Sequence, residues 1–390
     1  MSLYAQHGHA KSDRLDLALA EGTIDGVILG ARNEPIDKIA ACVNSFKGKG
    51  EVLFDPQFFI STFAPPNDRY LPDYPYYKGG LSSASFTGAK KLAAICEATI
   101  DFQLELGVDK LISPTIFCDG FETKWGQIAL NLADTSLDYH AGIKDAPPLL
   151  VNFLIAEQAL TSKKNVEAFL DQITSWEMSG IYLVIAREDG TYSQGFEPQR
   201  FAHALYMNYV LGEINGFEVV NGFSDFCGFI LRAVGSSAFA SGWYQGLRQF
   251  NKKSFIKSKG GGQVPRLRYS SAPLLNSIFL SELDDIRDAG LLENILSGVK
   301  FDNLLDSNSD AWNQRVSEHA HWETLSLLDA AIPKTLKARI DLVDSQLETA
   351  NAIYFMLEEA GIVFSANSGP LHLESWTEAF KTFKSLIGKA

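Results

Sequence analysis

Short apolar runs, each ending in polar residues, alternate with amphipathic stretches from residue 26 to near residue 300. Examples of these runs are GVILGAR at 26–32, EVLFDPQ at 51–57, LLVNFLIAE at 149–157 and GIYLVIARE at 180–188. Between them, apolar residues recur at the spacing of a helix that buries one face. Strands that alternate with helices favour βα units and a parallel sheet.

The pattern supplies enough strands to close a TIM barrel, in which parallel strands form a ring inside a ring of helices. The predicted strands are residues 26–31, 52–55, 110–116, 149–155, 181–186, 217–221, 237–241 and 266–269. The predicted fold class is therefore α/β, a (β/α)8 TIM-type barrel with a C-terminal helical appendage. Residues 227–234 are also apolar, but a crossover between parallel strands needs about a dozen residues, so a helix is predicted at 224–233.

The segments around these strands are assigned from their position. Residues 1–11 are predicted to form a disordered leader, and residues 12–20 a helix that closes the bottom of the barrel. Helices are predicted at 243–250 and 272–296, on either side of the last strand.

The alternation stops near residue 304, and the apolar residues beyond it keep the spacing of helices. We therefore predict a barrel at residues 1–303 and a helical extension packed on it at residues 304–390. Residues 56–87 form a long insertion after the second predicted strand, and its prolines exclude a regular helix or a central strand. Loops of this length in a compact domain usually serve as lids or binding loops.

Composition narrows the class of protein. The chain has 390 residues, of which 46% are hydrophobic and 21% charged, and its net charge is −13. So acidic a surface argues against indiscriminate binding to nucleic acid or anionic membranes. The cysteines are far apart, without a CxxC pair, and no apolar run reaches membrane-spanning length. With no apolar signal region at the N-terminus, the chain is predicted to be cytoplasmic.

Polar residues at the strand ends are the candidate ligand-binding residues, because TIM-barrel sites lie at the C-terminal ends of the strands. Asn152 lies inside an apolar run, and the alternation along that run places its side chain opposite Val151 and Phe153, toward the barrel interior. The predicted ligand-binding residues are Arg32, Asn33, Gln57, Asn152, Arg187, Asn221, Ser241, Gly242, Arg268 and Ser270. Each of them also fits a purely structural role, as a helix cap or a rim ion pair.

Carboxylates at the same strand ends are the candidate catalytic groups. Asp55 is predicted to act as acid/base or nucleophile, with Glu157 or Glu188 as its counterpart. Two carboxylates suffice for hydrolysis or glycosyl transfer. Arginines at positions 32, 187 and 268 would neutralise phosphate or developing negative charge. The predicted ligand is a small anion: a nucleotide, nucleobase or sugar phosphate.

A basic segment covers residues 248–268, with arginines and lysines and no acidic residue. Because the Debye length is about 8 Å at physiological salt, distant acidic groups do not cancel its charge. We predict a site for phosphate, or for a nucleic-acid or protein partner, and a solvated loop remains the alternative. If the segment begins on the bottom face of the barrel, it serves a different partner from the mouth. Its lysines are Lys252, Lys253, Lys257 and Lys259.

Aromatic residues are concentrated in the insertion at 56–87. They fit two interpretations equally well. One is a platform that stacks on a planar ligand, and the other is a small core that the loop needs for itself.

No sequence motif identifies a reaction. The chain lacks a P-loop, a GxSxG elbow, an HExxH motif and a GxGxxG turn after a strand. Pairs such as His7 and His9 lack a clear third ligand, so no metal site is predicted, and the cofactor is unknown. A non-catalytic barrel that serves as scaffold in a protein or nucleic-acid complex is therefore the alternative to an enzyme.

Overall fold

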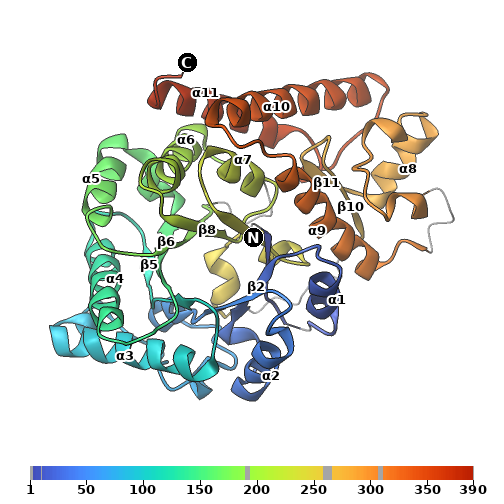
Figure 1. The fold of residues 1–390 in the computed structure, drawn as a ribbon. Coiled ribbons are helices and arrows are strands. Elements are labelled where there is room, and N and C mark those ends of the chain that lie inside the picture. Colours follow the sequence, from blue (N-terminus) through green and yellow to red (C-terminus); the bar gives the residue numbers. More distant parts are fainter. Residues whose placement is uncertain (1–2, 10, 189–193, 258–265, 306–310, 390) are drawn as a thin grey trace.

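The strands form a nearly closed parallel barrel surrounded by helices, as the sequence predicts (Figure 1). A computed structural model describes the chain except residues 1–2, 10, 189–193, 258–265, 306–310 and 390. The barrel strands are β1 (Leu3–Gln6), β2 (Gly26–Gly30), β3 (Glu51–Asp55), β4 (Leu111–Ile112), β5 (Phe117–Cys118), β6 (Leu149–Ala156), β7 (Gly180–Ala186), β8 (Glu218–Gly222) and β9 (Ala238–Ser241). β4 and β5 both pair with β6 and share one position in the ring.

Strand pairing runs around the ring in chain order. The hydrogen-bonded order is β3-β2-β1-β9-β8-β7-β6-β4, and all of these pairs are parallel. A parallel bridge between Leu53 and Lys110 brings β4 beside β3 and completes the circuit. The Lys110 amine lies 2.9 Å from Glu51 Oε2 and 2.5 Å from Glu218 Oε1, so one cation joins strands on both sides of this seam.

The prediction is wrong at both ends of the barrel. The first strand is β1, formed by residues that the sequence suggested were a disordered leader, and it pairs with β2 and β9. The predicted eighth strand lies outside the barrel. It is β10 (Arg268–Ser271), which pairs antiparallel with β11 (Asn276–Phe279). The N-terminal strand is only four residues long and gains its hydrogen bonds from a strand more than 200 residues away, which no local pattern shows.

Helices cover the outside of the barrel. They are α1 (Arg14–Ala20), α2 (Ile36–Phe46), α3 (Ala89–Leu106), α4 (Lys124–Ala141), α5 (Lys163–Ile173), α6 (Pro198–Asn208), α7 (Cys227–Val234) and α9 (Gln314–Ala330). α1 packs against α2 and α9, so it belongs to the outer ring and does not close the bottom. None of the helices among the described residues has the length and apolar character needed to span a bilayer.

α9 contacts α1, α7 and β1 and so completes the outer ring between the first and last helices. A division of the chain after residue 303 would separate this helix from the barrel wall. The predicted helix at 243–250 is only a short 3-10 turn (Gln245–Leu247), and the one at 272–296 is replaced by β11 and a shorter helix, α8 (Leu280–Asp288). The last two helices, α10 (Leu336–Glu359) and α11 (Leu371–Leu386), pack against α7 and α6 (Figure 1).

The insertion at 56–87 has a core of its own. Tyr74 and Tyr76 pack against Phe54 of β3 and Phe102 of α3, and the Tyr76 hydroxyl donates to the Pro56 carbonyl at 3.0 Å. Phe58, Phe59 and Phe63 are buried as well. Of the two interpretations, the packed loop is therefore correct, because these rings are committed to the protein interior and not presented to a ligand.

Candidate functional site

The mouth of the barrel is the end where the C-termini of its strands meet. Asp55, the last residue of β3, is 1% exposed there. Its Oδ1 accepts a hydrogen bond from the Gln57 backbone N–H at 2.9 Å. Burial raises the pKa of Asp55 to about 7, against which this hydrogen bond acts. A carboxyl that titrates near neutral pH has the acidity that a general acid or base requires.

Asn152 lies in the barrel interior, as the alternation along its strand predicts. Its neighbour Phe153 packs on Phe169 of α5, on the opposite side. The Asn152 backbone N–H donates to Ser113 Oγ at 2.9 Å. Its side-chain Oδ1 has no hydrogen-bond partner among the described residues. The side chain is 3% exposed, so it lies below the surface of the mouth.

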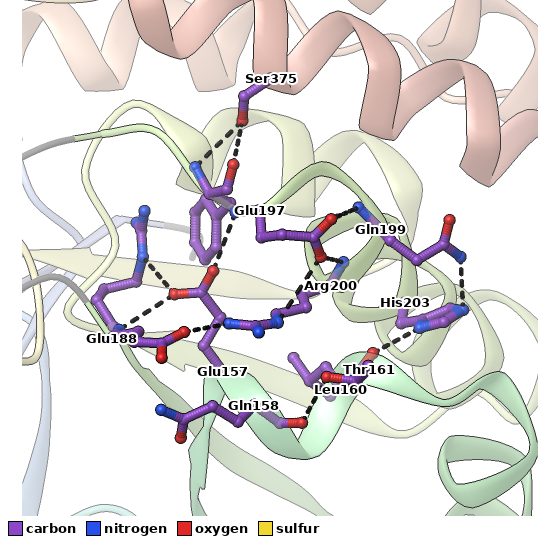
Figure 2. A network of polar contacts seen from close by, with 12 residues as sticks. Glu157, Gln158, Leu160, Thr161, Glu188, Glu197, Gln199, Arg200, His203 and Ser375 are labelled. Carbon is purple, nitrogen blue, oxygen red and sulfur yellow. Dashed lines mark hydrogen bonds and ion pairs between the residues drawn. The ribbon is translucent and has the colours of Figure 1, made fainter.

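Glu157 and Glu188 take part in a polar network that holds a loop (Figure 2). The Glu157 carboxylate accepts backbone N–H groups from Glu188 at 3.2 Å and Glu197 at 3.0 Å, and Arg187 Nε lies 3.5 Å from it. The Arg187 guanidinium stacks on Phe196. Ser375 of α11 bonds to both backbone groups of Phe196, which ties the network to the C-terminal helices.

The predicted pairing of these glutamates with Asp55 finds no support in the geometry. The Glu188 side chain is exposed and pairs with Arg200, which lowers the pKa of Glu188. Neither glutamate is among the groups that shift the pKa of Asp55. The carboxylate of Glu157 is occupied by donors that its own loop supplies, so its role here is to fix the loop after β7.

A small cavity of about 270 Å³ opens at the ends of β2 and β3. Here the structure brings together predicted residues Arg32, Asn33 and Gln57. The Arg32 backbone N–H donates to Gln57 Oε1 at 2.9 Å, and Asn33 Nδ2 donates to the His7 carbonyl at 3.0 Å. The Arg32 guanidinium is held by main-chain carbonyls, those of Asn67 and Ser254. Sequence reasoning missed the remaining polar residues of its wall, which include His9, Arg69 and Tyr244.

A large cavity of about 700 Å³ lies between the loop after β9, the β10–β11 hairpin and α9. Arg268 reaches it from the hairpin, with its guanidinium 3.8 Å from the centre of the Phe279 ring and donating to the Ser277 carbonyl at 2.6 Å. Other residues of this wall are Trp243, Tyr244, Arg248, Arg266, Phe279 and Gln314. They come from segments far apart in the chain, so strand-end patterning could not group them.

Arginines without a carboxylate partner are concentrated at these two cavities. Arg14, Arg187, Arg200, Arg232, Arg287, Arg315 and Arg339 each form an ion pair. The other arginines of the chain have none with a described residue. Arg32 and Arg69 line the small cavity, and Arg248, Arg266 and Arg268 line the large one. No aspartate or glutamate belongs to either wall as described.

Three of the predicted ligand-binding residues face helices. Ser241 and Ser270 Oγ lie 3.0 Å and 2.9 Å from the two ring nitrogens of His321 on α9. Asn221 donates to Asn208 of α6 at 2.8 Å. His321 is buried, and burial, followed by the charge of Arg248, lowers its pKa well below the usual value, so the ring is neutral. The His321 ring therefore joins the barrel, the hairpin and α9.

Close packing accounts for Gly242, the glycine that follows β9. A Cβ at this position would lie 2.1 Å from the Leu247 Cβ, and the Gly242 carbonyl accepts a hydrogen bond from Arg248 Nε at 3.0 Å. The glycine thus lets the loop fold back and place Arg248 in the wall of the large cavity.

The part of the basic segment that the structure describes up to residue 257 lies at the mouth, because Phe250 pairs with Ala186 at the C-terminal end of β7. Lys252 is partly buried, with its amine 4.2 Å from the centre of the Phe117 ring. Lys253 is exposed, and the Lys257 amine lies 4.0 Å from Asp68. Lys259 is outside the described residues. The lysines described are therefore only partly available to a partner.

A comparison with protein-family models and with curated proteins finds no match. Among solved structures, the dihydrodipicolinate synthase of Oceanobacillus iheyensis is similar with a TM-score of 0.33 and 10% identity, over 99% of this chain and 96% of that one. The enzyme from Bacillus clausii gives a TM-score of 0.31 and 11% identity, over 99% and 97% of the two chains. Likenesses of this size carry no information about the site, and the barrel stands on this chain's own strand pairing.

Proposed function

We propose that the barrel mouth binds a small phosphate-bearing molecule, and that the large cavity holds its phosphate. The observation that carries this proposal is the position of the unpaired arginines. Desolvating a cation that has no ion pair is costly, and at Arg248 and Arg268 burial lowers the pKa by more than the surrounding carboxylates raise it, so such groups are retained where a ligand supplies the charge. In a chain of net charge −13, they gather around two cavities without acidic walls.

The walls of the large cavity also favour a planar group. Trp243, Tyr244 and Phe279 contribute aromatic rings beside its arginines. Aromatic faces stack on bases, and arginines bind phosphate with a geometry that matches its oxygens. The volume of about 700 Å³ lies in the range of small-molecule sites. A nucleotide is therefore the class of ligand that we favour.

Acid–base chemistry in this proposal is assigned to buried aspartates. Asp55 keeps the role predicted from the sequence, because burial raises its pKa to about 7. Asp225 is a second candidate: burial raises its pKa to about 6, and it lines a narrow void of which Arg248 is also part. Hydrolysis or glycosyl transfer is the reaction class proposed, since both use carboxyl groups in these protonation states.

Replacing Arg266 with glutamine is expected to weaken the binding of a nucleoside 5′-monophosphate about tenfold, the loss of one charge-assisted contact. Arg266 is exposed, so the fold should tolerate the change. Isothermal titration calorimetry measures the dissociation constant. Arg287→Gln removes the same charge from α8 and should leave the affinity unchanged. Equal affinities for the wild type and Arg266→Gln would count against the large cavity as the phosphate site.

A further inference from the structure

We propose that the ligand carries two separate anionic groups, and that the small cavity is a second anion subsite. This inference rests on the proposed function, since it assigns one anionic group to each cavity. The two cavities meet at the segment after β9, because Tyr244 and Gly246 belong to both walls. A single extended molecule can therefore reach both by passing Tyr244.

The charges of the small cavity favour an anion. The Arg32 guanidinium is almost buried, and its hydrogen bonds go to the neutral carbonyls of Asn67 and Ser254. Arg69 adds a second positive charge, which, after burial, lowers the pKa of Arg32. The charge of Asp68 acts against this lowering, but Asp68 also lies beside Lys257 and accepts a hydrogen bond from Tyr77. An anion between Arg32 and Arg69 would relieve both the desolvation and the repulsion.

Backbone strain gives an independent reason to regard the small cavity as a ligand-binding site. Gln57, Arg69 and Phe223 have φ values of 50°, 47° and 53°, in the left-handed region that non-glycine residues rarely adopt. All three line the small cavity, although they come from three separate loops. Strained backbone of this kind persists where the surrounding structure holds it, and it clusters at ligand sites.

The geometry around Tyr244 explains how the two subsites stay distinct. Its hydroxyl lies 3.0 Å from His9 Nδ1, and its ring packs against Trp243. The ring is thereby fixed between the unpaired arginines of the two cavities. A molecule with one anionic group fills one side only, whereas a molecule with two gains from both, because the second contact becomes intramolecular.

The test compares butyl phosphate with a series of alkane-α,ω-diol bisphosphates of increasing chain length, by isothermal titration calorimetry on the whole chain. At least one bisphosphate is expected to bind about tenfold more tightly than butyl phosphate. Arg69→Gln should abolish this advantage and leave the affinity for butyl phosphate unchanged. Arg69→Lys, which keeps the charge, should retain part of the advantage and excludes a folding defect at this exposed position.

Three results overturn the inference, and they differ in what they say about the proposed function. If butyl phosphate binds and depends on Arg266, but no bisphosphate binds more tightly, the ligand has one anionic group and the proposed function stands. If a bisphosphate still binds more tightly than butyl phosphate in Arg69→Gln, the small cavity is not the second anion subsite, and the proposed function again stands. If neither probe binds at all, the proposed function fails together with the inference.

Discussion

Replacing His321 with leucine is expected to lower the free energy of unfolding by about 3 kcal/mol, because the buried Ser241 hydroxyl would lose its partner and the Ser270 hydroxyl would keep only Ser277. Ser241 ends a barrel strand and Ser270 belongs to the hairpin, and both bond to this one ring on α9. The ring also lies 3.4 Å from Asp225 Oδ1. Urea denaturation followed by circular dichroism measures the change.

The control for this prediction is His319→Leu, on the same helix. His319 is 5% exposed, and its Nε2 has no hydrogen-bond partner among the described residues, so its replacement should cost much less. A double variant that combines His321→Leu with Ser241→Ala should be more stable than His321→Leu alone, because the hydroxyl that has lost its partner is then absent. Equal stability of wild type and His321→Leu would show that the ring does not join these elements.

Replacing Asp55 with asparagine is expected to stabilise the protein at alkaline pH by up to about 4 kcal/mol. Burial raises the pKa of this carboxyl from 3.8 to about 7 in the folded state, and each pKa unit corresponds to about 1.36 kcal/mol. Folding therefore favours the protonated form. The wild type has the full benefit below pH 3.8 and loses it as the pH rises through about 7. Asparagine stays neutral throughout and keeps an oxygen to accept the Gln57 N–H.

Denaturation at pH 5 and at pH 8.5 tests this prediction. The advantage of Asp55→Asn over the wild type should be at most about 2 kcal/mol at pH 5, where the wild type has lost only part of the benefit, and larger at pH 8.5. Asp288→Asn, at an exposed position on α8, should match the wild type at both. An Asp55→Asn variant that is less stable at pH 8.5 would mean that the ionised carboxylate has a partner that stabilises it.

Turnover by Asp55→Asn also tests the catalytic role of Asp55. If this carboxyl is the acid or base, Asp55→Asn removes turnover while the protein gains stability at high pH. Binding of a phosphate-bearing ligand should persist, because the unpaired arginines are unchanged. A variant that binds and turns over normally would transfer the role to another group, such as Asp225.

Several residues at the barrel mouth could be predicted from their positions at the ends of the strands. Arg32, Asn33 and Gln57 were predicted together because they follow adjacent strands, and they line one cavity. Arg268 also lines a cavity, although the sequence placed it on a barrel strand and the structure places it on a hairpin. Ser241 and Ser270 were assigned to the ligand but bond to His321, because the helix that carries this histidine was expected to lie outside the barrel.

The sequence by itself determined most of the local elements, because the spacing of apolar residues along a segment shows which of its faces is buried, and that spacing is a property of neighbouring residues. Tertiary structure alone decided the rest. It decided that residues 3–6 complete the ring, since this four-residue strand joins β2 to β9, which lies far along the chain. It also decided which arginines have a carboxylate within reach and which carboxyl titrates near neutrality. Both depend on distance and burial, which exist only once the chain has closed on itself.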